Sequence, residues 1–176
     1  RIDISVQEND WPEYRGGMKH DAYSDGEVSS DFHQRWKYVP VQTYEPRPND
    51  TYPAIAEMQP TSPIIVDRYV IWAGSDGIVR CLDNASGTMM WEYPTGGRIY
   101  SAPTYHDGCV YVGSGDGWLY CIDLGTGDLA WRFRGAPVEM RFNLYGHLAS
   151  PWPILTGALI DNDIVYFAAG LLSEYG

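Results

Sequence analysis

The feature that most constrains this chain is a repeat with a period of 40 residues. The stretch CLDNASGTMMW at residues 81–91 returns as CIDLGTGDLAW at residues 121–131, and both carry the frame Cys-x-Asp-x-x-x-Gly-x-x-x-Trp. Without gaps, the same register aligns nine pairs of identical residues, from Pro63 with Pro103 to Trp91 with Trp131. A period near 40 residues is typical of solenoids, propellers and helical arrays.

The residues within each copy favour the propeller. In the second copy, a short apolar stretch at 102–105 precedes three runs rich in β-branched and aromatic residues, at 109–114, 118–123 and 129–133. Glycine-rich turns separate the runs, and none of the runs has helical periodicity. Four short antiparallel strands in one repeat are the content of one propeller blade.

The frame itself has a physical explanation as a staple between blades. The aspartate carboxylate can accept the backbone N–H groups of a tight turn between the third and fourth strands, and the glycine supplies a positive φ. The tryptophan then lies on the outermost strand, where its ring can pack against the next blade. The predicted staple residues are Asp83, Gly87, Trp91, Asp123, Gly127 and Trp131.

Further units are recognisable on both sides of these copies. Residues 35–38, RWKY, resemble residues 90–93, MWEY, and are interpreted as the closing strand of a preceding blade. Residues 164–170 resemble the strand at 109–113 and are interpreted as part of a following blade. We therefore predict an N-terminal segment with a closing strand at 1–41, a proline-rich loop at 42–61, blades at 62–100 and 101–140, and an insertion with an incomplete blade at 141–176.

The charge balance excludes some classes of partner. The net charge is −11, and an acidic surface repels phosphate, so nucleic acids and anionic membranes are disfavoured. The sequence has no apolar run of the roughly 18 residues that indicate a transmembrane helix. It begins at Arg1 without a methionine or a signal peptide, so we expect a mature product, a processed piece or an excised fragment.

With these motifs the chain resembles the bacterial PQQ-like β-propeller repeat family, which has quinoprotein-type and BamB-like members. The frame is similar to the family's tryptophan-docking motif, Ala-x-Asp-x-x-x-Gly-x-x-x-Trp, with Cys81 and Cys121 in place of alanine. Trp11-Pro12 and Arg15-Gly16 resemble the family's N-terminal Trp-Pro-x-x-Arg-Gly. Residues 146–170 resemble a segment of one secreted or periplasmic branch. The resemblance implies a periplasmic or extracellular location in a bacterium.

The same resemblance leaves two functions open, a quinone-dependent dehydrogenase and a non-enzymatic scaffold. For the dehydrogenase it implies a vicinal cysteine pair, a calcium ion held by carboxylates and an amide, and a catalytic aspartate. The sequence has no Cys-Cys pair, and its aspartates at 76, 83, 107, 116, 123, 161 and 163 all fall in predicted turns or staples. We therefore assign no catalytic residue, no metal ligand and no cofactor. PQQ with calcium would be the cofactor only under the alternative function, the quinone-dependent dehydrogenase.

Two of the three cysteines leave a question about disulfide formation. Cys109 and Cys121 face each other across a hairpin if its turn is centred near Gly115. A cross-strand disulfide is then one interpretation in an oxidising compartment. The other, which we favour, is two small buried thiols, because free cysteine is a common core residue.

The insertion that follows the second blade is a candidate partner-binding surface. We expect it to protrude at one face of the disc, where five side chains would form an aromatic and basic spot typical of a protein or glycan partner. These residues are Arg141, Phe142, Tyr145, His147 and Trp152. The alternative is an insertion that packs over the propeller face.

The length of the chain sets how much of a propeller it can form. A ring of seven or eight blades needs about 280 to 320 residues at about 40 residues a blade, and this chain has 176. We expect an all-β partial arc of about three blades, which belongs to a longer protein or needs a second chain to close the ring; a four-bladed ring fits poorly. We predict a non-enzymatic scaffold that presents a surface for protein or glycan interaction. The alternative is a fragment of a PQQ-dependent alcohol or sugar dehydrogenase.

Overall fold

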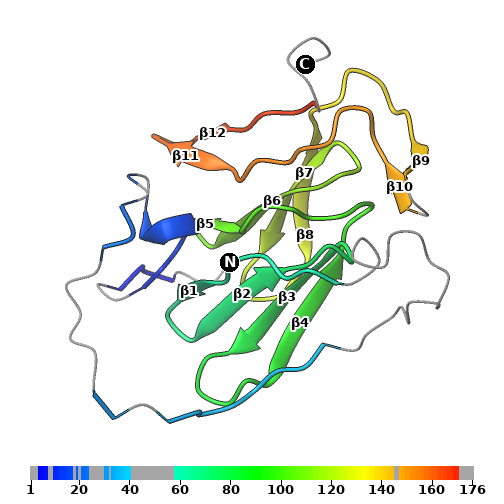
Figure 1. The fold of residues 1–176 in the computed structure, drawn as a ribbon. Coiled ribbons are helices and arrows are strands. Elements are labelled where there is room, and N and C mark those ends of the chain that lie inside the picture. Colours follow the sequence, from blue (N-terminus) through cyan, green and yellow to red (C-terminus); the bar gives the residue numbers. More distant parts are fainter. Residues whose placement is uncertain are drawn as a thin grey trace, which may run out of the picture.

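β-Strands form nearly all of the regular structure in the described part of this chain (Figure 1). The computed structural model describes residues 4–7, 10–17, 19, 21–23, 30–31, 33–40, 58–144 and 147–170. A single 3₁₀ turn, η1 (Tyr14–Gly16), is the exception among them. No helix in these ranges is long and apolar enough to cross a bilayer.

Two four-stranded antiparallel sheets follow one another along the chain. The first contains β1 (Ile64–Val66), β2 (Tyr69–Ala73), β3 (Ile78–Asp83) and β4 (Met89–Pro94). The second contains β5 (Thr104–His106), β6 (Cys109–Gly113), β7 (Trp118–Asp123) and β8 (Leu129–Arg134). Each strand pairs with its neighbour in sequence, because glycines with positive φ, such as Gly77 (80°) and Gly117 (86°), allow tight turns between strands.

Two hairpins follow the sheets. The first is formed by β9 (Phe142–Leu144) and β10 (His147–Ala149), and the second by β11 (Leu159–Asp161) and β12 (Ile164–Tyr166). In Figure 1 the β11–β12 hairpin lies beside the second sheet, on the side away from the first, and the β9–β10 hairpin projects at the side. The described part therefore contains two complete blade-like sheets and a two-stranded third unit.

The strand register explains why cysteine and tryptophan recur together. In the first sheet Ile71 pairs with Cys81, and Cys81 pairs with Trp91. The second sheet repeats this pairing: Tyr111 pairs with Cys121, and Cys121 pairs with Trp131. In both sheets the register shifts directly after the cysteine. A small, fully buried side chain at this position leaves room for the indole on the neighbouring strand.

Three apolar clusters hold the units together in a stack. The largest lies between the two sheets and includes Ile71 and Trp91 from the first and Val110 and Ile122 from the second. A second cluster joins the other face of the second sheet to the β11–β12 hairpin and includes Ile154. A third covers the outer face of the first sheet, where residues 36, 38 and 58 pack on it. Burial of apolar area between units is the main stabilising contribution in such a stack.

This architecture confirms the expected fold class, an all-β partial propeller. The four-stranded antiparallel sheets lie face to face, and within the described ranges they do not close into a ring. One local expectation differs from the structure. Residues 35–38 carry no strand, because no described segment pairs its backbone with theirs. The predicted loop at 42–61 lies mostly outside the described residues.

The hairpin register also resolves the cysteine question for the native fold. The β6–β7 turn is centred at Asp116 rather than Gly115, because Gly117 adopts the positive φ and the Asp116 carboxylate accepts the Trp118 N–H. This difference of one residue pairs Cys109 with Asp123 and Cys121 with Tyr111. The cross-strand disulfide is therefore not formed, and all three cysteines are buried thiols.

Candidate functional site

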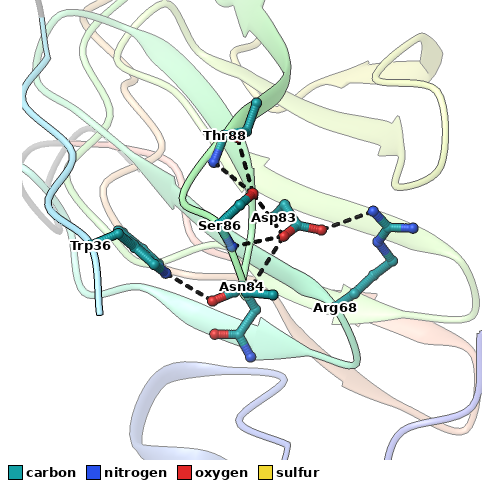
Figure 2. A network of polar contacts seen from close by, with 7 residues as sticks. Trp36, Arg68, Asp83, Asn84, Ser86 and Thr88 are labelled. Atoms are coloured by element: carbon teal, nitrogen blue, oxygen red, sulfur yellow. Dashed lines mark hydrogen bonds and ion pairs between the residues drawn. The ribbon is translucent and has the colours of Figure 1, made fainter. Parts of the chain in front are cut away.

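The turn between β3 and β4 holds the network of polar contacts shown in Figure 2. The indole N–H of Trp36 donates to the carbonyl oxygen of Asn84 at 2.8 Å. Gly87 has a φ of 70°, and a Cβ atom on it would lie 2.6 Å from the ring of Trp36. Glycine is therefore required at position 87 for two reasons: the backbone has a positive φ, and a side chain would clash with the indole of Trp36.

Asp83 stabilises this turn from within. Its Oδ1 accepts the backbone N–H groups of Ala85 (3.1 Å) and Ser86 (2.9 Å), and its Oδ2 contacts Arg68 Nη2 at 2.8 Å. The Ser86 hydroxyl donates to the same Oδ1 at 2.9 Å. These interactions lower the pKa of the Asp83 carboxyl; the hydrogen bond from the Ser86 hydroxyl contributes most, followed by the Ser86 N–H and Arg68.

The turn between β7 and β8 repeats the arrangement with a different tryptophan. Trp91 of the first sheet donates its indole N–H to the carbonyl oxygen of Leu124 at 2.8 Å. A Cβ atom on Gly127, which has a φ of 78°, would lie 2.6 Å from the Trp91 side chain. Asp123 accepts the N–H groups of Gly125 and Thr126 at 2.9 and 3.0 Å. We call residues 83–87 and 123–127 the docking turns.

Trp91 therefore contacts the docking turn of the following unit, and not the turn of its own frame. Trp36 occupies the first docking turn although it lies on no strand, and the only sequence signal for it is the Trp-x-Tyr pattern shared with residues 91–93. Trp131 has no such turn among the described residues. Its side chain lies edge-on to Tyr111, with the ring centroids 5.8 Å apart, and is 42% exposed, compared with 9% for Trp91.

The predicted partner-binding residues are spread over the β9–β10 hairpin and its flanks. Arg141 is exposed and lies 3.9 Å from the Glu139 carboxylate, whereas Phe142 and Trp152 are partly buried. His147 begins β10, and Tyr145 lies outside the described residues. The exposed apolar side chains here are mainly aliphatic, a feature that the aromatic pattern did not indicate. They are Val138, Met140, Leu144 and Leu148.

A pocket of about 470 Å³ lies where the segments that precede β1, β5 and β11 meet residues 13 and 14. Hydroxyl groups dominate its lining, and Glu13 is the one charged residue among the described residues that line it. The lining residues are Glu13, Tyr14, Thr61, Ser62, Tyr100, Ser101, Ala102, Thr104, Thr156, Gly157, Ala158 and Leu159. Across the described ranges, no three His, Cys, Asp or Glu side chains are grouped so that they could hold a metal ion.

Comparison with known proteins agrees with this geometry. The profile of the family described as outer membrane protein assembly factor BamB matches residues 33–168, well over half of the chain. Among the curated proteins, none matches this sequence.

Three solved structures illustrate the similarity. Quinohemoprotein alcohol dehydrogenase ADHIIG from Pseudomonas putida HK5 is 25% identical, with a TM-score of 0.53 over 62% of this chain and 16% of its own. The quinohemoprotein alcohol dehydrogenase from Comamonas testosteroni is 17% identical, with a TM-score of 0.60 over 92% of this chain and 23% of its own. BamB from Moraxella catarrhalis is 22% identical, with a TM-score of 0.48 over 61% of this chain and 29% of its own.

The chain thus spans less than a third of each of these proteins. The family profile covers both docking turns and their tryptophans, and the Comamonas structure shares the fold over nearly all of the chain. This chain belongs to the PQQ-like propeller-repeat family described as outer membrane protein assembly factor BamB.

Proposed function

We propose that this chain is part of a non-enzymatic β-propeller scaffold of the bacterial cell envelope or exterior, and that it presents the β9–β10 hairpin to a protein partner. The observation that carries the proposal is the set of exposed aliphatic side chains on and beside that hairpin, where Met140 is 52% and Leu148 57% exposed. An isolated two-stranded hairpin is only marginally stable in water, so a partner that packs on it would stabilise it. The family's description as an outer membrane assembly factor supports the location.

Protein is the favoured partner class because the exposed apolar groups are aliphatic. Aliphatic side chains gain free energy mainly by being removed from water, which suits a complementary apolar protein surface. Arg141 at the same hairpin offers an exposed cation on a chain of net charge −11, so an acidic rim on the partner would be complementary. A glycan would instead call for exposed aromatic rings, and the described aromatic residues of this insertion are partly buried.

The same scaffold would be completed by further blades, from the same protein or from a second chain. Trp131 and Phe133 on β8 are 42% and 57% exposed, and no described strand pairs with the outer edge of β12. A neighbouring unit that brings its own docking turn would cover Trp131 in the way that residues 123–127 cover Trp91. Ring closure by such units removes exposed sheet edges.

Site-specific photo-crosslinking in the source bacterium tests the scaffold proposal. A photoreactive residue at Met140 or Leu148 is expected to give a discrete protein adduct, and the same residue at Val6, which is 50% exposed and lies away from the insertion in sequence, serves as control. A Leu148→Asp substitution is expected to suppress the adduct formed from Met140. Adducts of equal intensity from Val6, or none from the hairpin, would contradict the proposal.

The competing candidate is a fragment of a quinone-dependent dehydrogenase, which the 25% identity to the Pseudomonas enzyme favours. The hydroxyl-lined pocket suits the quinone poorly, because it offers no cationic side chain to a tricarboxylate. Addition of PQQ, calcium, an alcohol and a dye acceptor to the full-length protein separates the two functions. Reduction of the dye would replace the scaffold proposal.

A further inference from the structure

The pocket of about 470 Å³ described above is lined by polar side chains to which the scaffold proposal assigns no role. Four chain segments meet there, and it shares no residue with the β9–β10 hairpin. Seven of its lining residues carry hydroxyl groups: Tyr14, Thr61, Ser62, Tyr100, Ser101, Thr104 and Thr156. A hydroxyl both donates and accepts hydrogen bonds, so a wall of this kind matches a ligand whose own groups do the same.

Three of the threonine hydroxyls are held in place by the backbone. Thr104 donates to the carbonyl oxygen of Ala158 at 2.7 Å, which ties β5 to the segment before β11. Thr61 accepts the N–H of Ala73 at 3.1 Å, and Thr156 accepts the N–H of Ala168 at 3.1 Å. Each oxygen keeps further accepting capacity. The pocket is therefore pre-organised, which lowers the entropic cost of binding.

Three other hydroxyls have no hydrogen-bond partner in the described part of the chain. Those of Ser62 and Tyr100 lie on exposed residues, whereas the Ser101 oxygen is buried and unpaired. A buried polar atom without a partner is unfavourable, and a ligand hydroxyl would relieve that cost after one rotation about the serine χ1 bond. The Tyr100 ring, on a residue that is 51% exposed, offers an apolar face beside these groups.

The charge of the pocket discriminates between ligand classes. Its one charged lining residue, Glu13, is 9% exposed, and the net charge of the chain is −11, so an anion is repelled. A purely apolar ligand would cover the hydroxyls without pairing them. An ammonium ion offers donors only and leaves the donating hydroxyls unsatisfied.

We propose that this pocket binds a neutral polyhydroxylated ligand of the size of one or two sugar rings. The volume of about 470 Å³ lies in the range of small-ligand sites. The ligand exchanges hydrogen bonds with the hydroxyls of Ser62, Tyr100 and Ser101, and the Glu13 carboxylate accepts from a ligand hydroxyl.

Titration of the full chain with maltose, followed by NMR chemical shifts, tests this proposal; methylammonium and citrate provide the cationic and anionic comparisons. Maltose is expected to shift the amide signals of residues 100–102, 104 and 156–159. Tyr100→Ala is expected to weaken binding by about tenfold and Ser101→Ala by roughly threefold to tenfold, as expected for the loss of one or two contacts. The matched control is Tyr166→Ala, because Tyr166 is 49% exposed and does not line the pocket.

Each result decides the proposal in one direction. Saturable shifts with maltose that Tyr100→Ala weakens and Tyr166→Ala leaves unchanged would support it. Absence of shifts at the highest soluble maltose concentration, tighter binding of methylammonium or citrate, or equal effects of the two tyrosine variants would overturn it. Circular dichroism of each variant establishes that it is folded. Because the hairpin and the pocket are separate, crosslinking at Leu148 fails or succeeds independently of this titration.

Discussion

Replacement of Trp91 by alanine tests whether an indole on the docking turn of the next unit holds the two sheets together. Trp91 is 9% exposed, lies against Gly127 and donates to the Leu124 carbonyl at 2.8 Å. Truncation of a buried tryptophan costs about 3–5 kcal/mol through lost burial and the cavity that remains. The Leu124 carbonyl, on a residue that is fully buried, also loses its donor, which adds about 1 kcal/mol. We expect a loss of about 4–6 kcal/mol in the free energy of unfolding.

Trp131→Ala is the matched control for this substitution. Trp131 occupies the same place in the frame and pairs with Cys121 as Trp91 pairs with Cys81, but it is 42% exposed and has no docking turn among the described residues. Its truncation removes far less buried area, so we expect a loss of about 1–2 kcal/mol. The two substitutions are made in nearly the same local sequence frame. They differ in whether the tryptophan that is removed contacts the docking turn of a following unit.

Equilibrium unfolding in urea, followed by circular dichroism, measures both variants against the unsubstituted chain. The expected result is a midpoint for Trp91→Ala well below that of Trp131→Ala, with similar slopes, because the slope reports the surface exposed on unfolding. Equal losses for the two variants would refute the reasoning. In that case the indole would act within its own strand pair, and the contact with the following turn would contribute little.

Three further predictions concern the docking turns and the thiols. Because its folded pKa is lowered, first by the Ser86 hydroxyl, Asp83 contributes stability that is fully present above the usual carboxyl pKa and is lost as pH falls through the lowered value. The melting temperature of Asp83→Asn should therefore fall less between about pH 7 and about pH 3 than that of the unsubstituted chain, and identical slopes would contradict this. Gly127→Ala should destabilise the chain by more than about 1 kcal/mol in urea, since its φ is 78° and Trp91 lies against it; unchanged stability would exclude close contact. Burial raises the pKa of the Cys81 thiol to about 12, so a thiol reagent at about pH 8 should leave Cys81 unmodified in the folded chain and react with three thiols in denaturant. A count below three in denaturant would indicate a disulfide.

Much of the blade is predictable from sequence because its determinants are local. The alternation of β-rich runs with glycine turns at 109–133 predicts the strands β6, β7 and β8, since backbone preference and side-chain alternation act within a few residues. The same local logic locates Asp123 and Gly127 at a turn. It failed by one residue at the β6–β7 turn, because either Gly115 or Asp116 could serve as the centre, and that single step determined which residues the cysteines face.

The candidate sites were less predictable because they form between units. The exposed aliphatic side chains beside Arg141 and the polar pocket around Ser101 depend on how separate segments pack, and no periodicity in the sequence describes that packing. Trp36 illustrates the same point. Its pattern suggested a strand, but the structure shows an indole on the first docking turn without any strand.

By itself, the sequence determined the repeat, the all-β class and the residue types of each docking turn, because turn chemistry and strand propensity are properties of short stretches of chain. Only the tertiary structure decided which tryptophan lies on which turn, that Cys109 and Cys121 remain apart, and which surfaces stay open to a ligand or a partner. The physical reason is that contacts between stacked sheets depend on the register and the offset of whole units. The 40-residue repeat specifies the strands and turns within each unit, but it does not specify how neighbouring units pack against one another.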